Sequence, residues 1–252
     1  MSIFKKLFGP KEIAPIDLNV LKVDMHSHLI PGIDDGAPDV ETAVNLVKRF
    51  IEMGYEKIVT TPHIMSDHYK NTPETISNGL EALRAGLKEA GIKIPIEAAA
   101  EYYLDDSFME LLDDKENDLL SIGRNKYLLF ELSMLEEPRE LSDAIFKMSL
   151  RGYKPVLAHP ERYGYMVKDF KKLEDVKNRG ADLQVNLMSL VGHYSPEVKK
   201  TAEKLIDAGM VDFIGTDCHN MRHTRVLEEC RKSVYLKKLI DSGNLKNTWL
   251  LK

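Results

Sequence analysis

The sequence has few cysteines and no long apolar run. Cys218 and Cys230 are the only cysteines in 252 residues, which argues against a disulfide framework and favours a reducing cytoplasm. No stretch approaches the roughly 18 apolar residues of a membrane-spanning helix. The first ten residues lack the apolar core and cleavage site of a secretory signal. We therefore expect a cytoplasmic protein without a transmembrane segment.

A large charge of one sign is also lacking, as are several common catalytic motifs. The formal net charge of -5 gives no support for broad electrostatic binding to nucleic acid. No GxxxxGK[ST] phosphate loop and no HExxH zinc helix is present. Neither cysteine fits a Cys-x5-Arg phosphatase motif, because Thr224 and Leu236 stand where the arginines would be. These absences turn attention to the other polar side chains.

Apolar, β-type runs alternate with helical patterns along nearly the whole chain. Helices that end at glycine and lead directly into an apolar run indicate a parallel sheet. The last long helix is expected over 223–239. The sequence predicts seven strands, over 21–29, 57–61, 93–100, 127–132, 154–158, 182–187 and 211–215.

Polar residues with metal-binding side chains stand at the end of six of these seven strands. An open sheet draws its site from fewer strands, so the pattern favours an α/β fold with a closed or distorted seven-stranded barrel. In such a barrel these side chains converge on one mouth, where imidazole and carboxylate together suit a transition metal. The residues are His26, His28, His63, Glu101, Glu131, His159, Asp217 and His219.

The loop after the first strand and three arginines extend this candidate site. Asp34 and Asp35 either form an ordinary Asp-Gly turn or supply a further ligand. Arg162, Arg222 and Arg225 follow the ligand-type residues closely. Guanidinium groups beside a metal suit a phosphate-bearing substrate, whereas the alternative for each is a surface salt bridge.

Domain organisation is expected to be simple, with one domain over 21–252 after a tail of residues 1–20. No linker-like composition or sequence repeat divides the chain. In the tail, Ile3, Phe4, Leu7 and Phe8 beside two lysines would suit a weak membrane-surface or partner contact. The alternative is a short tail that packs on its own domain or frays.

Four segments together resemble a known family. The run from Asp24 to Gly36, with His-Ser-His and Pro-Gly-Ile-Asp-Asp-Gly, resembles the signature of the polymerase and histidinol phosphatase (PHP) superfamily. Thr-Thr-Pro-His (60–63), Ala-His-Pro-Glu-Arg-Tyr (158–163) and Thr-Asp-Cys-His-Asn (216–220) follow in order. Their spacing resembles the bacterial tyrosine-protein phosphatases of capsule and exopolysaccharide operons, the CpsB/CapC/YwqE type. The resemblance runs from about residue 21 to the last predicted helix.

The resemblance implies a distorted seven-stranded PHP-type barrel with three metal ions, manganese foremost and iron or zinc as alternatives. Arg162 matches the family's phosphate-contacting arginine, and Arg225 or Arg222 would be a second. By the same resemblance, one ion would be held by His26, His28, Glu101 and Asp217, a second by Glu101, Glu131 and His159, and a third by Asp35, His63 and His219, with Asp34 as the alternative to Asp35.

The function implied is that of a metal-dependent protein-tyrosine phosphatase, a phosphoric monoester hydrolase that uses a metal-activated water. Its implied protein partner is an autophosphorylating bacterial tyrosine kinase with a tyrosine-rich tail. The alternatives are a small-molecule phosphatase of the histidinol-phosphate type, an amidohydrolase, a PHP nuclease and an inactive kinase-binding barrel. Glu131 stands where many amidohydrolases carry a lysine, and the net charge argues against a nuclease.

Overall fold

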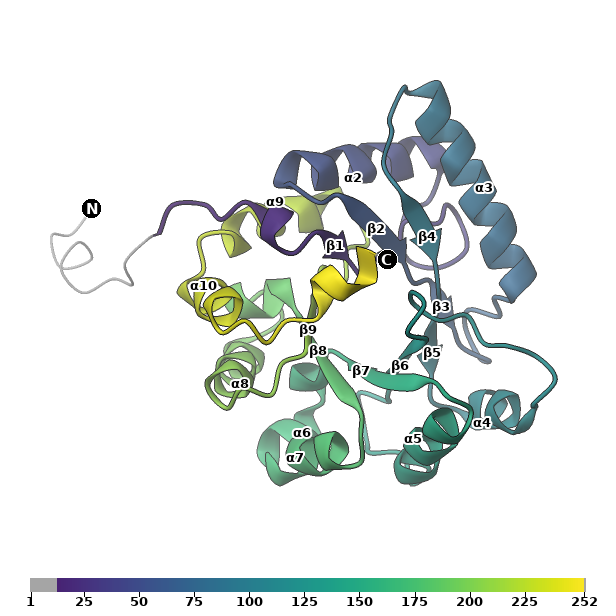
Figure 1. Cartoon of the computed structure of the whole chain (residues 1–252), viewed down its shortest axis with the longest axis vertical. Coiled ribbons are helices and arrows are strands. Elements are labelled where there is room, and N and C mark those ends of the chain that lie inside the picture. Colours follow the sequence, from purple (N-terminus) through teal and green to yellow (C-terminus); the bar gives the residue numbers. More distant parts are fainter. Residues whose placement is uncertain (1–12, 252) are drawn as a thin grey trace, which may run out of the picture.

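Parallel strands surrounded by helices make up the computed structural model, which describes residues 13–251 (Figure 1). The strands are β1 (Val23–Asp24), β2 (Lys57–Thr60), β3 (His63–Ile64), β4 (Ile96–Ala98), β5 (Glu101–Tyr103), β6 (Tyr127–Glu131), β7 (Lys154–Ala158), β8 (Asp182–Asn186) and β9 (Phe213–Gly215). The α-helices are α2 (Val40–Met53), α3 (Pro73–Glu89), α4 (Asp106–Asp113), α5 (Leu141–Leu150), α6 (Gly164–Lys168), α7 (Lys171–Asn178), α8 (Pro196–Asp207), α9 (Met221–Cys230) and α10 (Val234–Asp241). Short 3₁₀ turns are η1 (Leu18–Val20), η2 (Pro160–Arg162), η3 (Leu187–Val191) and η4 (Asn247–Leu251).

The strands form two parallel sheets, which confirms the α/β class. One sheet has the order β1-β2-β4 and the other β3-β5-β6-β7-β8-β9. Two short strands lie just beyond predicted ones: β3 follows β2 after a break at Thr61–Pro62, and β5 follows β4 after a break at Ala99–Ala100. Pro62 has no N–H to donate to a ladder, so strand pairing breaks there. Among the described residues the ladders therefore do not close into one continuous seven-stranded ring.

Backbone and side-chain bonds nevertheless hold the first and last strands side by side. Beyond the ends of β1 and β9, Ser27 pairs with Cys218 as an isolated parallel bridge, and the His28 N–H donates to the Cys218 carbonyl at 3.0 Å. At the other end, the buried Asn247 amide donates to the Val23 carbonyl at 3.2 Å and to the Ile214 carbonyl at 2.8 Å. The loops that follow β1 and β9 are thereby brought together.

Helix α2 shows how the sequence sets the outer layer. The Asp39 side chain caps its start by accepting from the Thr42 N–H at 2.7 Å. The helix ends at Gly54, whose φ of 106° is left-handed. Apolar residues repeat every three or four positions, and Val47 and Phe50 are fully buried in the core. The predicted last helix is wrong in one respect, because α9 and α10 are separate and Ser233 caps the second.

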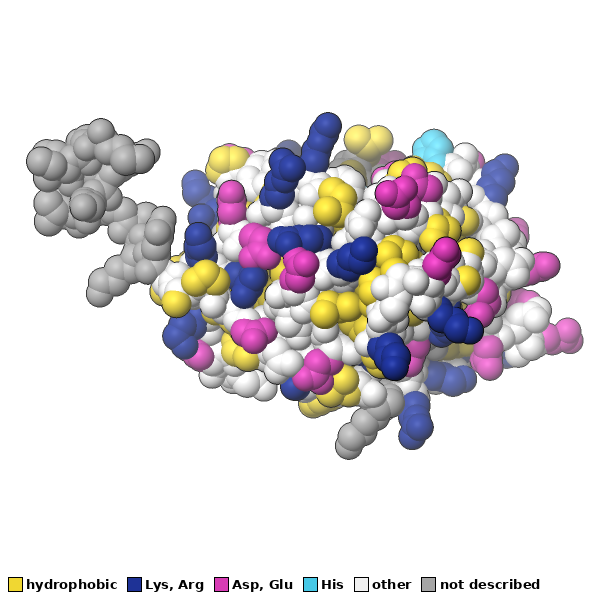
Figure 2. Space-filling view, turned by 90° about the horizontal axis from the view of Figure 1, so that it is seen from above, with side chains coloured by type: hydrophobic (Ala, Val, Ile, Leu, Met, Phe, Trp, Pro, Cys, Tyr) yellow, Lys and Arg dark blue, Asp and Glu magenta, His cyan; other side chains and the backbone are white. Residues whose placement is uncertain are grey.

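Part of the predicted tail belongs to this packing. Leu18 is fully buried in the main core, and the Ile16 N–H donates to the Arg231 carbonyl at 2.8 Å. The proposed membrane-surface contact of Ile3, Phe4, Leu7 and Phe8 lies outside the described residues. Within residues 13–251 no helix combines the length and apolarity needed to cross a bilayer. Basic and acidic side chains are interspersed over the face drawn in Figure 2.

Candidate metal centre

Nine imidazole and carboxylate side chains meet at the carboxyl ends of the strands. They form four overlapping groups, within each of which the potential ligand atoms lie within 4.8 Å of one another. Each strand ends in a loop on the same side of its sheet, so the side chains that follow the strands point to a shared centre. The nine are His26, His28, Asp35, His63, Glu101, Glu131, His159, Asp217 and His219.

Glu101 lies at the middle of this cluster and is fully buried. Its Oε2 atom is 3.2 Å from His26 Nε2 and 3.4 Å from His28 Nε2. Its Oε1 atom is 3.0 Å from His159 Nε2. The same Oε2 is 3.2 Å from His63 Nδ1. The two oxygens of one carboxylate therefore face different groups of imidazoles, which suits a ligand shared between ions.

The remaining carboxylates extend the cluster on either side. Glu131 Oε1 is 2.9 Å from His63 Nδ1. Asp35 Oδ1 is 3.5 Å from His63 Nε2 and 3.4 Å from His219 Nε2. Asp34 has a different role, because its buried side chain accepts from His28 Nδ1 at 2.8 Å. The structure thus places Asp35 in the cluster and Asp34 behind one of its histidines.

Asp217 divides its two oxygens between the cluster and a polar network. Oδ1 is 3.5 Å from His26 Nε2. Oδ2 accepts from Arg162 Nη1 at 3.1 Å, from Asn186 Nδ2 at 2.6 Å and from the Tyr194 hydroxyl at 3.3 Å. The Arg162 guanidinium also lies over the Tyr194 ring, 4.4 Å from its centroid. This network leaves one carboxylate oxygen free to face an ion.

Two of the cluster residues have backbones in the left-handed region. His159 has φ of 35° and Asp217 has φ of 50°. Such conformations cost roughly 1–3 kcal/mol for a residue with a side chain and are concentrated at functional sites. His159 directly follows the last residue of β7, and Asp217 lies two residues beyond the end of β9, so this backbone conformation directs both side chains toward the mouth. Packing of β7 and β9 supplies the energy that holds them there.

Electrostatics in the cluster favour ionised carboxylates. Burial raises the pKa of Glu101, but His26 and His63 outweigh it and hold that pKa well below its ordinary value. Burial lowers the pKa of His26, but Glu101 and Asp217 outweigh it and raise the pKa to about 9. A buried negative charge requires a cation nearby. Protonated imidazoles supply it here, and metal ions would replace those protons.

The side chains fit a metal ion on a further observation. Glu101 Oε2, Glu131 Oε1, His63 Nδ1 and His159 Nδ1 are buried, and none has a hydrogen-bond partner of suitable geometry within residues 13–251. Buried polar atoms without a partner are rare in native proteins, and an ion is one explanation. Glu101, Glu131 and His63 together form one of the four groups, and His63 Nδ1 lies close to both carboxylates. Nitrogen and carboxylate oxygen are the donors that manganese, iron and zinc accept.

Comparison with known proteins agrees with the resemblance found in the four sequence segments. Residues 22–246 match the family model described as capsular polysaccharide synthesis, CpsB/CapC. The chain belongs to the CpsB/CapC family.

Named relatives of this CpsB/CapC chain include two curated proteins. It is 28% identical to the tyrosine-protein phosphatase YwqE of Bacillus subtilis over 79% of this chain and 78% of that one. It is 28% identical to the putative tyrosine-protein phosphatase CapC of Staphylococcus aureus over 89% and 84%. Among solved structures, those of YwqE from B. subtilis and CpsB from Streptococcus pneumoniae are described as metal-dependent tyrosine phosphatases. One chain from this set matches with a TM-score of 0.78 and 26% identity, over 90% of this chain and 90% of that one.

Strand β8 carries site residues that sequence reasoning missed in this CpsB/CapC chain. Gln184 Oε1 accepts from His26 Nδ1 at 2.7 Å, and Gln184 Nε2 donates to Asn186 Oδ1 at 2.9 Å. Tyr194 follows in the next loop and reaches Asp217. The available signal was two amides at i and i+2, Gln184 and Asn186, on either side of Val185 in β8, the same alternation that marked His26 and His28. As neutral groups, they did not stand out as ligands.

The three predicted arginines differ in their position relative to the metal-centre cavity. Arg162 lines a cavity of about 460 Å³ together with Tyr194 and six of the nine cluster residues. Arg222 and Arg225 are exposed on α9 and do not line that cavity. A three-residue spacing puts both on the solvent face of the helix, opposite the buried Leu227. The structure brings only the first of the three predicted arginines to the site.

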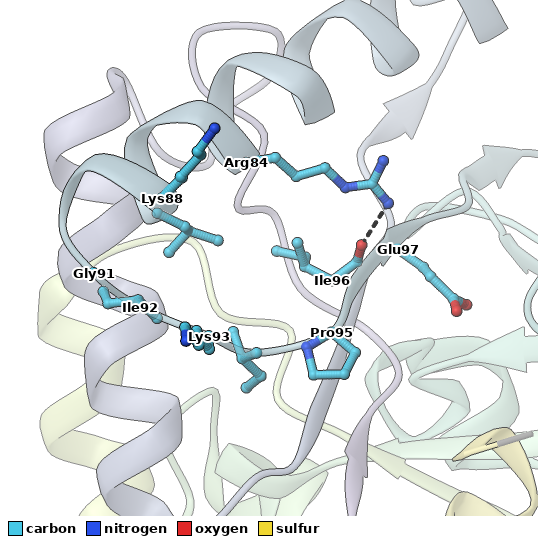
Figure 3. A pocket seen from close by; sticks show the side chains of 10 residues that line it. Arg84, Lys88, Gly91, Ile92, Lys93, Pro95, Ile96 and Glu97 are labelled. Carbon is cyan, nitrogen blue, oxygen red and sulfur yellow. Dashed lines mark hydrogen bonds between the residues drawn. The ribbon is translucent and has the colours of Figure 1, made fainter.

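A second pocket lies at the opposite end of the strands. It occupies about 450 Å³ between the end of α3 and the start of β4 (Figure 3). Arg84 Nη2 donates there to the Ile96 carbonyl at 2.8 Å. Glu97 is the one carboxylate in its lining, and the nine-residue cluster contributes nothing to it. This pocket is therefore distinct from the candidate metal centre.

Proposed function

We propose that this chain is a metal-dependent protein-tyrosine phosphatase, a phosphoric monoester hydrolase. The observation that carries the proposal is the nine-residue cluster with its unpartnered buried donor atoms, open to a cavity that Arg162 also lines. The tyrosine-phosphatase names of relatives in the CpsB/CapC family support it.

Three ions per chain are proposed, manganese foremost, with iron or zinc as alternatives. When bound, such ions make water a nucleophile at neutral pH and offset charge on the phosphoryl oxygens. The first would be held by His26, His28, Glu101 and Asp217, the second by Glu101, Glu131 and His159, and the third by Asp35, His63 and His219. The donor chemistry supports the assignment, and the close groups His26/His28/Asp217 and His28/Asp35/His63/His219 agree with the first and third sets.

The chain's own side chains then orient the reaction. Arg162 presents a guanidinium at the cavity wall, where it would pair with two oxygens of a phosphoryl group. Gln184 and Asp34 accept hydrogen bonds from the Nδ1 atoms of His26 and His28, which leaves the Nε2 atoms of both rings facing the centre. The phenol of the leaving tyrosine has a pKa of about 10, so its phenolate needs less protonation to leave than an alkoxide does.

The protein context of the reaction is also part of the proposal. We propose that the substrate is phosphotyrosine in the tail of an autophosphorylating bacterial tyrosine kinase of polysaccharide synthesis. The relatives' names and the family description support this choice. A cytoplasmic location is consistent with two buried, unpaired cysteines. We further propose that the two sheets are parts of one distorted seven-stranded barrel, supported by the Ser27–Cys218 bridge.

Phosphate release tests this function. Protein stripped by a chelator and reloaded with Mn²⁺ is offered a phosphotyrosine peptide and histidinol phosphate separately. We expect metal-dependent turnover that favours the peptide and is lost in His159→Ala and Glu131→Gln. Glu229→Gln, an exposed change on α9, is the matched control and should retain full activity. Faster release from histidinol phosphate would move the assignment to a small-molecule phosphatase.

A further inference from the structure

A large groove adjoins the metal-centre cavity. It occupies about 990 Å³ and is lined by the start of α3, by α4 and by residues 114–119. Met65 lines both the groove and the cavity. In β3 the consecutive residues His63 and Ile64 divide between them, His63 lining the cavity and Ile64 the groove. The groove therefore lies next to the cavity in which a phosphoryl group would bind.

The groove combines an apolar floor with an acidic rim. Ile64, Phe108, Leu111 and Leu119 supply much of the apolar surface. Its charged lining residues are four carboxylates, Asp105, Glu110, Asp114 and Asp118, and one cation, Lys70.

The acidic residues of the rim are not equally available to a ligand. The carboxylate of Asp105 is used to cap α4, through the Phe108 N–H at 2.8 Å, and also accepts from the Ser66 N–H at 3.0 Å. Asp118 accepts from the Tyr153 hydroxyl at 3.1 Å. Glu110 is exposed on α4 and has no side-chain hydrogen bond or ion pair to any residue in 13–251. It is the rim carboxylate best placed to bind an incoming cation.

We propose that this groove binds the residues next to phosphotyrosine in the substrate and selects peptides with lysine or arginine there. The inference rests on the proposed function, because a phosphotyrosine seated in the cavity must lead its flanking chain out past the mouth. An extended segment beside an apolar floor buries its aliphatic side chains, while cations on lysine or arginine face the acidic rim. Complementary charge at such a rim changes the encounter rate and selectivity.

Pairs of phosphotyrosine peptides test the proposal. One peptide carries two lysines beside the phosphotyrosine and the other two glutamates, and para-nitrophenyl phosphate serves as a substrate too small to reach the groove. Exposed ion pairs contribute about 0.2–1 kcal/mol each, so we expect kcat/KM of the Mn²⁺-loaded protein to favour the lysine peptide by about 5-fold at low salt. High salt should reduce this preference.

Charge reversals identify the groove as the source of the preference. Glu110→Lys should reduce the preference by about 3-fold, and Lys70→Glu should increase it by a similar factor. Glu229→Lys on α9 makes the same charge change as Glu110→Lys but lies outside the groove, so the preference should stay unchanged. All three variants should hydrolyse para-nitrophenyl phosphate at the wild-type rate.

Three outcomes would overturn the inference. Equal kcat/KM for both peptides would remove the charge selection. An unchanged preference in both Glu110→Lys and Lys70→Glu, or an equal change in Glu229→Lys, would place the selection elsewhere. In each case para-nitrophenyl phosphate is still turned over, so only the groove assignment fails. Absence of turnover with all substrates would instead overturn the proposed function.

Discussion

Replacement of Gln184 by leucine should weaken metal binding without unfolding the protein. Gln184 is fully buried, and its Oε1 accepts from His26 Nδ1 at 2.7 Å. Leucine has a similar volume but cannot accept, so the imidazole N–H is left unpaired and the ring is free to turn. An unpaired buried donor costs about 1–3 kcal/mol, and about 1.4 kcal/mol is a tenfold change in affinity. Loss of such an orienting partner typically lowers metal affinity or activity about 10–100-fold.

The assay for Gln184→Leu is competition between stripped protein and a chelating dye for Mn²⁺, followed by peptide turnover at saturating metal. We expect the dissociation constant of the ion held by His26 to rise about 10-fold or more. Thermal melting of the metal-free variant controls for folding. A well-folded variant with wild-type Mn²⁺ affinity would refute the claim that Gln184 fixes the histidine for metal binding.

Three further variants test the packing against His26, the buried Asp212 carboxylate and the contact between β1 and β9. Gly215→Ala should lower Mn²⁺ affinity because its Cβ would lie 2.8 Å from the His26 Cβ; wild-type affinity would contradict this. Asp212→Asn should lower the free energy of unfolding by about 1–3 kcal/mol at neutral pH, in urea titrations. Burial raises the pKa of Asp212, but hydrogen bonds, led by that from Lys177, outweigh it and hold the pKa below its ordinary value. The stability that the ionised Asp212 contributes is therefore present above about pH 4 and is lost as the pH falls. An equal loss of stability in Asp212→Asn in strong acid would contradict this. Asn247→Ala should lower the free energy of unfolding by about 1–3 kcal/mol in the same titration, because it leaves buried carbonyl groups of β1 and β9 without their hydrogen-bond donor. No loss of stability would refute that role.

Much of the site could be read from the sequence because ligand chemistry and strand alternation are local properties. His26 and His28 at i and i+2 share a face in any extended segment, and the structure places both beside Glu101. Apolar runs between glycine-terminated helices gave the strands in order. The roles of these side chains as metal ligands remain predictions, although their convergence is now described.

The rest depended on contacts between distant segments. Gln184 meets His26 only because β8 and β9 pair and β9 lies beside the segment after β1. The predicted strand over 57–61 corresponds to β2 alone, and β3, beyond the break at Pro62, joins the other sheet. Spacing alone could not show that Arg225 lies on the exposed face of α9, outside the cavity lining, because the direction of α9 is set by the packing of its apolar face.

The most direct test is the rate of phosphate release from a phosphotyrosine peptide as a function of bound Mn²⁺ per chain. Stripped protein is loaded stepwise, and each sample is divided between metal analysis and assay. We expect no activity without metal, a rise that saturates near three ions per chain, and loss of both metal binding and activity in Glu101→Gln. Peptide turnover that continues in metal-free protein, or full metal loading without any turnover, would contradict the central claim.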